Sequence, residues 1–186
     1  MNAIDIANQA LIMIGGERIT ALTEDSESAR LVNEIFYPSL NTLLQEHPWN
    51  FAKGRVTLAR SATTPDWDYD YQYPLPSDCL QVISFDGQDE GYDFVIEDEM
   101  VVTNYTTCKI TYTKEITDMN KLSAMFRTAF TAYLASQLAP YLTNTATYAQ
   151  GASQQFMLYM KKAKVQNARE SKRYKSQEGS WLTARL

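Results

Sequence analysis

The chain has 186 residues, 45% of them hydrophobic and 12% aromatic, so it can bury a sizeable core but is short for two large domains. Its longest apolar run, residues 10–14, is far below the roughly 20 residues that cross a bilayer, and the basic start of a signal peptide is missing. These features argue against a membrane protein and predict synthesis in a cytoplasm, and the net charge of −5 disfavours general binding to nucleic acid.

The first predicted element is a helix over residues 2–16. Asn2 is a good N-cap with Asp5 three residues later, and Gly15 and Gly16 can adopt the left-handed conformation that ends helices. The polar residues of this segment form one narrow stripe and nearly all others are apolar. We therefore expect other elements or a partner chain to surround the helix on most sides.

A second helix is predicted to start within residues 23–28, which supply caps and acids, and to run to Glu46. Pro38 interrupts its apolar pattern but the spacing resumes beyond it, which indicates a kink rather than an end. Pro48 cannot donate a backbone hydrogen bond and biases His47 away from helical geometry. The helix should therefore end just before this proline.

Beyond this junction the pattern changes to the period of two that is typical of strands, with turn signals between the runs. The predicted strands are residues 55–58, 79–85, 92–96, 100–103 and 108–113. They predict a small antiparallel sheet that is inserted into a helical body.

Helical spacing returns near Asp118 or Asn120, with an apolar stripe too broad for a surface helix. This segment should form the central helix of the bundle and turn near Pro140. The last helix is predicted over residues 145–174, and at 1.5 Å per residue it would be about 45 Å long, more than a core of this size needs.

The predicted fold class is α+β, mainly a bundle of about four helices with an inserted small antiparallel sheet and an extended C-terminal tail. Residues 1–48 and 116–175 form the helical body, residues 49–115 the β subdomain, and residues 176–186 the tail. The tail contains apolar residues but is too short to form a core.

The second half of the last predicted helix is basic, although the whole chain is acidic. Its cations face one acid, Glu170, and form a basic strip: Lys161, Lys162, Lys164, Arg169, Lys172, Arg173 and Lys175. Nucleic-acid phosphates would suit this strip, and DNA binding there would fall steeply with salt. Because no aromatic residues that stack bases are interleaved, an acidic patch on a protein partner is at least as good a candidate.

Catalytic patterns are absent: the chain has no phosphate-binding glycine loop, Cys-His cluster or nucleophile elbow. We expect no catalytic, cofactor-binding or metal-binding residues. The best enzyme alternative is residues 66–73, where acids alternate with aromatics, and where Asp66, Asp68 or Asp70 would serve a glycoside hydrolase. We favour a structural role, with an aromatic face that packs on the body or a neighbour and acids that guard a sheet edge.

Four segments resemble a known family: residues 10–19 (ALIMIGGERI), 28–33 (SARLVN), 47–52 (HPWNFA) and 73–80 (YPLPSDCL). In this order they resemble tail tubular protein A, the head-to-tail adaptor of short-tailed bacteriophages. The second half matches mainly in its pattern, a helix pair and a polar tail that ends in residues 179–182 (GSWL).

The resemblance implies a non-enzymatic protein of the virion tail, made in the host cytoplasm. It implies a ring of twelve copies between the portal protein and the tail nozzle protein, through which DNA passes without specific binding and without contact with a membrane. An overlong last helix and an apolar first helix suit a protomer that buries surface against neighbours.

Two sets of residues are candidate contacts in such an assembly. The tail is expected to order on the portal, with Trp181 as anchor; the portal-docking residues are Ser180, Trp181, Leu182 and Leu186. The residues that face the nozzle or a neighbouring protomer are Tyr69, Tyr71 and Tyr73.

Overall fold

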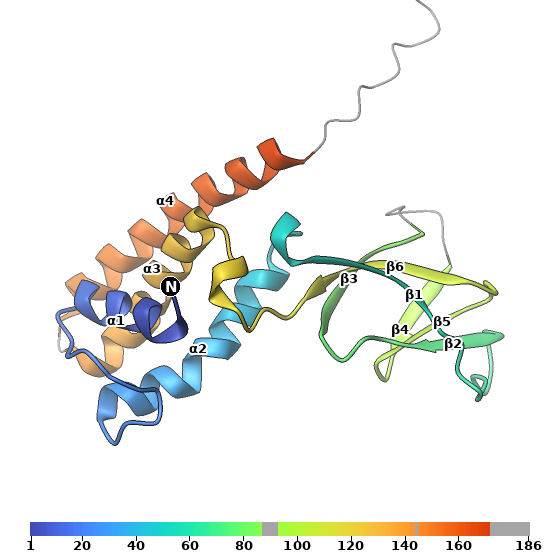
Figure 1. The fold of residues 1–186 in the computed structure, drawn as a ribbon, viewed down its shortest axis with the longest axis horizontal. Helices are drawn as coiled ribbons and strands as arrows, with labels where there is room; N and C mark the ends of the chain where they lie inside the picture. The colour runs from blue at the N-terminus through green and yellow to red at the C-terminus, as the bar shows by residue number, and fades with distance from the viewer. Residues whose placement is uncertain (87–92, 144, 172–186) are drawn as a thin grey trace, which may run out of the picture.

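The structure is a computed structural model that describes residues 1–86, 93–143 and 145–171. Its helices are α1 (Ala3–Met13), α2 (Glu27–Gln45), α3 (Ala124–Leu142) and α4 (Ala146–Glu170), with 3₁₀ turns at Asn50–Ala52 and Met119–Lys121. Its strands are β1 (Lys53–Leu58), β2 (Tyr71–Pro74), β3 (Cys79–Phe85), β4 (Phe94–Glu97), β5 (Met100–Thr103) and β6 (Cys108–Lys114). The helices gather at one end of an elongated molecule and the strands at the other (Figure 1).

The predicted caps of α1 are confirmed. The Asn2 side chain accepts a hydrogen bond from the Asp5 N–H at 2.8 Å, and the Asp5 carboxylate accepts one from the Asn2 N–H at 2.7 Å. Beyond the helix, Gly15 has a φ of 74°, a conformation that costs glycine little. Both ends of α1 are therefore set by its own sequence.

Pro38 lies inside α2, which continues to Gln45 as the resumed apolar spacing predicted. Pro140 lies inside α3, which ends two residues later at Leu142, close to the predicted turn. The expected extent of α4 was wrong: the helix ends at Glu170, because Ser171 adopts extended angles of φ −77° and ψ 127°.

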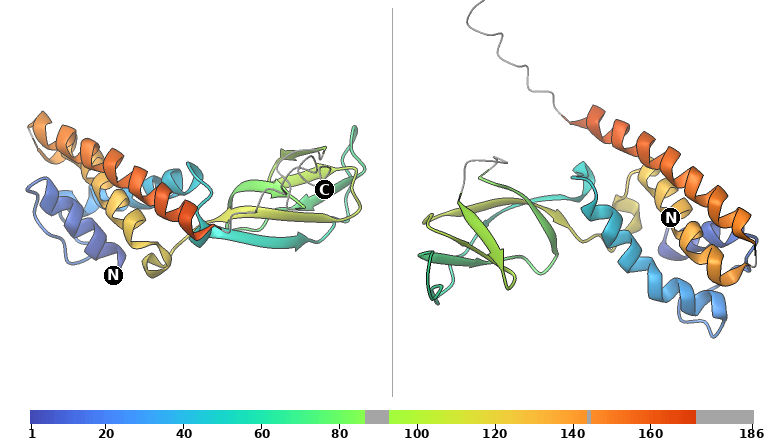
Figure 2. Two further views of the ribbon diagram at one scale, coloured as in Figure 1. Left: turned by 90° about the horizontal axis from the view of Figure 1, so that it is seen from above. Right: turned by 180° about the vertical axis from the view of Figure 1, so that it is seen from behind.

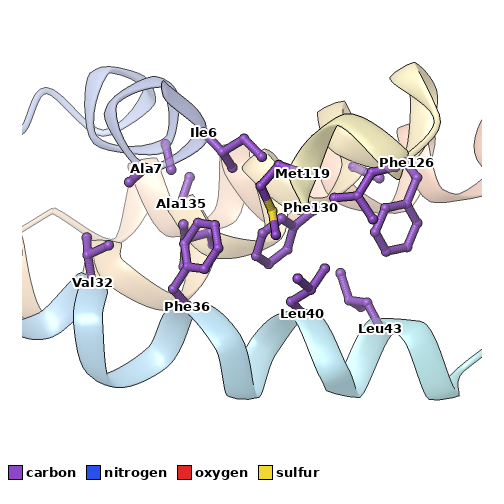
Figure 3. Close-up of a cluster of buried hydrophobic side chains, with 14 of the residues drawn as sticks. Ile6, Ala7, Val32, Phe36, Leu40, Leu43, Met119, Phe126, Phe130 and Ala135 are labelled. Atoms are coloured by element: carbon purple, nitrogen blue, oxygen red, sulfur yellow. The ribbon is translucent and has the colours of Figure 1, made fainter. Parts of the chain in front are cut away.

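The four helices share one core in which α3 is central. α3 contacts α1, α2 and α4, as its broad apolar stripe predicted. Figure 3 shows Phe36 and Leu40 of α2 facing Phe130 of α3, with Ile6 of α1 above them in the view. The Phe36 and Phe130 rings meet edge to face at a centroid distance of 5.1 Å.

The inserted β structure consists of two three-stranded antiparallel sheets, in the orders β1-β6-β3 and β2-β5-β4, rather than the one sheet expected. Buried side chains from both sheets form a second core, which includes Leu58 and Ile110 of the first sheet and Tyr73 and Val101 of the second. β2 was not predicted as a strand, because Pro74, its last residue, read as a turn signal. Pro74 is tolerated because β2 is an edge strand.

The two subdomains lie end to end (Figure 2), and a few side chains tie them together. Gln45 at the end of α2 donates to the Leu80 carbonyl at 3.0 Å, and Asn41 donates to the Glu115 carboxylate at 3.1 Å. At the junction, the buried Trp49 donates its indole N–H to the Leu43 carbonyl at 2.9 Å and contacts Phe126 of α3. The predicted helix end before Pro48 thus places Trp49 in the helical core.

Candidate interaction surface on the last helix

The outward side of α4 exposes large apolar side chains. One face of the helix packs on α3 and buries Ala152, Met160 and Ala163. On other faces Met157, Leu158 and Val165 are 68%, 51% and 47% exposed. A helix that packs on one neighbour in this way leaves apolar surface for a partner.

Two open grooves run along this side of α4. The first, of about 540 Å³, includes Met125 of α3 and Leu158 in its lining, and the second, of about 520 Å³, includes Met157 and Glu46. Both grooves are lined by Lys161 and Val165, which form the ridge between them. The surface is therefore shaped to receive side chains on both flanks of one helical ridge.

Cations are mixed with these apolar residues. Lys161, Lys162 and Arg169 are exposed, whereas Lys164 forms an ion pair with Glu46 at 2.8 Å. We define the α4 surface as Met125, Met157, Leu158, Lys161, Lys162, Val165 and Arg169. It joins apolar contact area to positive charge, the composition expected of a protein docking site.

A buried asparagine fixes the second half of α4 against the junction. Asn167 Oδ1 accepts the Asn50 N–H at 2.7 Å, and the Asn50 side chain donates to the Asn167 carbonyl at 2.9 Å. Asn167 Nδ2 lies 3.0 Å from Nε2 of His47. Because an amide nitrogen only donates, this contact needs an unprotonated Nε2.

The environment of His47 favours that unprotonated form. Burial lowers the pKa of His47 below its usual 6.5, and the charges of Lys164 and Lys53 lower it further, against a weaker opposite effect of Glu46. Neutral His47 and Asn167 therefore form a matched pair that positions the basic half of the helix.

The three predicted contact tyrosines occupy different environments. Tyr73 is 1% exposed and donates its hydroxyl to the Tyr105 carbonyl at 2.9 Å, so it belongs to the β core and offers no surface. Tyr69 and Tyr71 are half-buried. The guanidinium carbon of Arg60 lies over the Tyr71 ring, 4.1 Å from the ring centroid. Only Tyr69 and Tyr71 remain as surface candidates.

The acids of the hydrolase alternative do not share a strand face. β2 starts at Tyr71, and Asp68 before it has a φ of 67°, so residues 66–70 are not extended as the alternation required. Asp66, Asp68 and Asp70 are all exposed. The paired carboxylates across a cleft that glycoside hydrolysis needs are not formed by this segment alone.

The portal-docking residues Ser180, Trp181, Leu182 and Leu186 lie outside the described residues, as does the end of the basic strip, Lys172, Arg173 and Lys175. Their roles stay predictions.

The described ranges hold no group of three or more His, Cys, Asp or Glu side chains placed to bind a metal ion. Burial raises the pKa of Cys108 to about 11 and also raises that of Cys79, so both thiols resist ionisation. Within those ranges, too, no helix combines the length and hydrophobicity that crossing a bilayer requires.

The apolar half of the α4 surface was missed at the sequence level. Met157, Leu158 and Val165 were not singled out from the sequence. The available signal was the run of five apolar residues at 156–160, because consecutive positions on a helix cannot all face one neighbour.

The chain matches no protein-family model, and no curated protein matches it significantly. The function is therefore argued from the geometry of the surface and from the segments that resemble the adaptor family.

Proposed function

We propose that the protein is a structural head-to-tail adaptor of a short-tailed phage virion and has no enzymatic role. In this proposal, copies form a ring, a dodecamer by resemblance, that joins the portal protein to the tail nozzle protein. DNA passes through the ring without specific binding, and no membrane is involved. The protein is made in the host cytoplasm and resides at the head-to-tail interface of the virion.

The observation that carries the proposal is the α4 surface. Met157, Leu158 and Val165 project from a well-formed helix and contribute little to the core of one protomer. Exposed apolar surface of this kind, mixed with cations, supports assembly with protein partners rather than a monomeric state. We name the portal and nozzle proteins as these partners because of the four segments that resemble the adaptor family.

The tail and the tyrosines have separate roles in this proposal. Ser180, Trp181, Leu182 and Leu186 dock into the portal, with Trp181 as the aromatic anchor. Tyr69 and Tyr71 face the nozzle or a neighbouring protomer. The acidic balance of the chain, −5, keeps passing DNA from binding to the ring.

The test is the mass of the purified protein, alone and after mixing with its portal protein. A stoichiometric ring that forms on the portal supports the adaptor role, and no association at any ratio contradicts it. Deleting residues 176–186 should abolish portal binding and leave the fold intact by circular dichroism. Retained binding after this deletion would refute the docking role of the tail.

A further inference from the structure

The sheet β2-β5-β4 carries an acidic end. Tyr69 donates its hydroxyl to Asp93 at 3.3 Å, and the Asp70 N–H donates to Asn104 at 2.9 Å, which joins the loop before β2 to the segments that flank β4 and β5. The exposed carboxylates beside these contacts are Asp68, Asp70 and Asp93, and Glu97 lies at the other end of the short strand β4. We call this set the acidic sheet end.

Tyr69 links two segments of the acidic sheet end, because its hydroxyl donates to Asp93 while Asp68 and Asp70 flank it in the chain. Burial raises the pKa of Tyr69, and the charges of Asp93, Asp68 and Glu97 raise it further. Residues from two distant parts of the chain thus concentrate negative charge on one surface.

Exposed apolar side chains lie among these acids. Val95 of β4 is 38% exposed and points to the same side of the strand as Glu97, and Trp67 is exposed in the loop before β2. β4 is an edge strand of its sheet among the described strands. The acidic sheet end therefore has the same mixed composition as the α4 surface, but with the opposite charge.

One chain cannot bring its own two surfaces together. Figure 1 shows α4 on the helical body and β4 in the sheet subdomain at the opposite end of the elongated molecule. Contact between the surfaces requires two molecules. Because the surfaces differ, the contact is heterologous, and its repetition closes a ring or extends a filament.

We propose that the α4 surface of one copy docks on the acidic sheet end of a second copy. Lys161, Lys162 and Arg169 face the carboxylates, while Leu158 and Val165 contact Val95. This inference rests on the proposed function, since it assigns the contact between neighbouring protomers of the ring. Charge complementarity orients the two copies, and burial of the apolar residues holds them.

A disulfide trap tests the contact on the full-length protein. One population carries Val165→Cys and a second carries Val95→Cys, both with Cys79→Ala so that the remaining native thiol is the buried Cys108. Mixing under mild oxidation should give a mixed dimer by mass spectrometry. The matched control replaces Val95→Cys by Thr57→Cys, an exposed strand position of the other sheet.

Charge reversal provides the second readout. Lys161→Glu with Lys162→Glu in the first population should slow the mixed cross-link about tenfold, as should Asp70→Lys with Glu97→Lys in the second. Combining both reversed populations should restore the rate. As a control, Glu27→Lys with Glu34→Lys on the exposed side of α2 should leave the rate of the mixed cross-link unchanged.

Each outcome decides the proposal. A cross-link that is specific to the Val165 and Val95 pair and is rescued by double reversal supports it. Equal yields with Thr57→Cys, no cross-link at all, or sensitivity to the α2 reversal instead would overturn it. Capture of added DNA by the α4 surface in place of the second copy would overturn it as well.

The portal experiment separates this contact from the adaptor role. A specific cross-link without portal binding leaves the contact standing and contradicts the adaptor function. Portal-bound rings of the charge-reversed single variants would support the adaptor function and contradict this contact.

Discussion

Asn167 Nδ2 lies 3.0 Å from Nε2 of His47, the only histidine of the chain. This contact joins the basic half of α4 to the junction where α2 ends and the β subdomain begins. Because Asn167 also accepts the Asn50 N–H, one side chain fixes both the helix and the start of the insert. One of the hydrogen bonds that hold α4 against the junction therefore depends on the protonation of a single imidazole.

The stability of the protein should fall in mild acid. The folded pKa of His47 is lowered below 6.5, so between that lowered value and 6.5 the unfolded chain binds more protons than the folded one. The stabilisation is fully present above 6.5 and is lost as the pH falls through the folded pKa. Urea unfolding from about pH 8 to pH 5 measures it, and His47→Phe should reduce the slope in this range.

Replacing Asn167 by aspartate should reverse the direction of the His47 shift. The carboxylate still accepts the Asn50 N–H, but it no longer donates to Nε2 and instead attracts an imidazolium. The pKa of His47 should rise above that of the wild type in an NMR titration of its ring protons. A pKa that stays the same or falls would show that Asn167 does not control this proton.

Truncating Trp49 should severely destabilise the helical body. The side chain is buried, contacts Phe51 and Phe126, and donates to the Leu43 carbonyl. Trp49→Ala should lower the free energy of unfolding by roughly 3–5 kcal/mol in denaturant titrations. Trp49→Phe keeps an aromatic ring but loses the hydrogen bond, so it should cost about 1–3 kcal/mol. Equal losses for both would rule out a contribution from the hydrogen bond.

Two glycine substitutions should have opposite effects. A Cβ at Gly54 would lie 2.4 Å from Cε of Lys114 and 2.7 Å from a ring carbon of Tyr112, whose hydroxyl donates to Asp78. Gly54→Ala should therefore cost about 1–3 kcal/mol. Gly151 in α4 meets nothing within 4 Å, so Gly151→Ala should stabilise by up to about 1 kcal/mol. Thermal melts of both variants check the contrast.

Removing apolar side chains from the α4 surface should affect assembly and not the fold. Leu158→Ser should change the free energy of unfolding by no more than about 0.5 kcal/mol, because the side chain is half exposed. Ring formation on the portal should weaken. The matched control is Met160→Ser, which removes a buried side chain of the same helix and should destabilise the monomer by about 2–5 kcal/mol.

Local signals predicted the helical body well. Asn2, Gly15 and Pro48 act on their own neighbourhood, and α1 and α2 begin and end close to the residues they indicated. Pro38 also behaved as its surroundings suggested, since the apolar spacing on both sides of it serves one core.

The β subdomain was less predictable, because strand pairing depends on residues far apart in the sequence. Period-two alternation does not show which sheet a strand joins, so five runs suggested one sheet where two exist. The alternation of residues 66–73 was also interrupted at Asp68, whose positive φ has no strong sequence signal. The burial of Tyr73 followed from that pairing, and the spacing alone did not show it.

The position of the sheets within the chain dictates the order in which the protein can fold during synthesis. β1 and β6, the first and last strands of the insert, pair directly, with Lys53 opposite Thr113, so the insert is a closed unit with its own core. The helical core, in contrast, joins Ile6 to residues as late as Ala163. On the ribosome the β subdomain can therefore be complete while α1 and α2 still wait for α3 and α4.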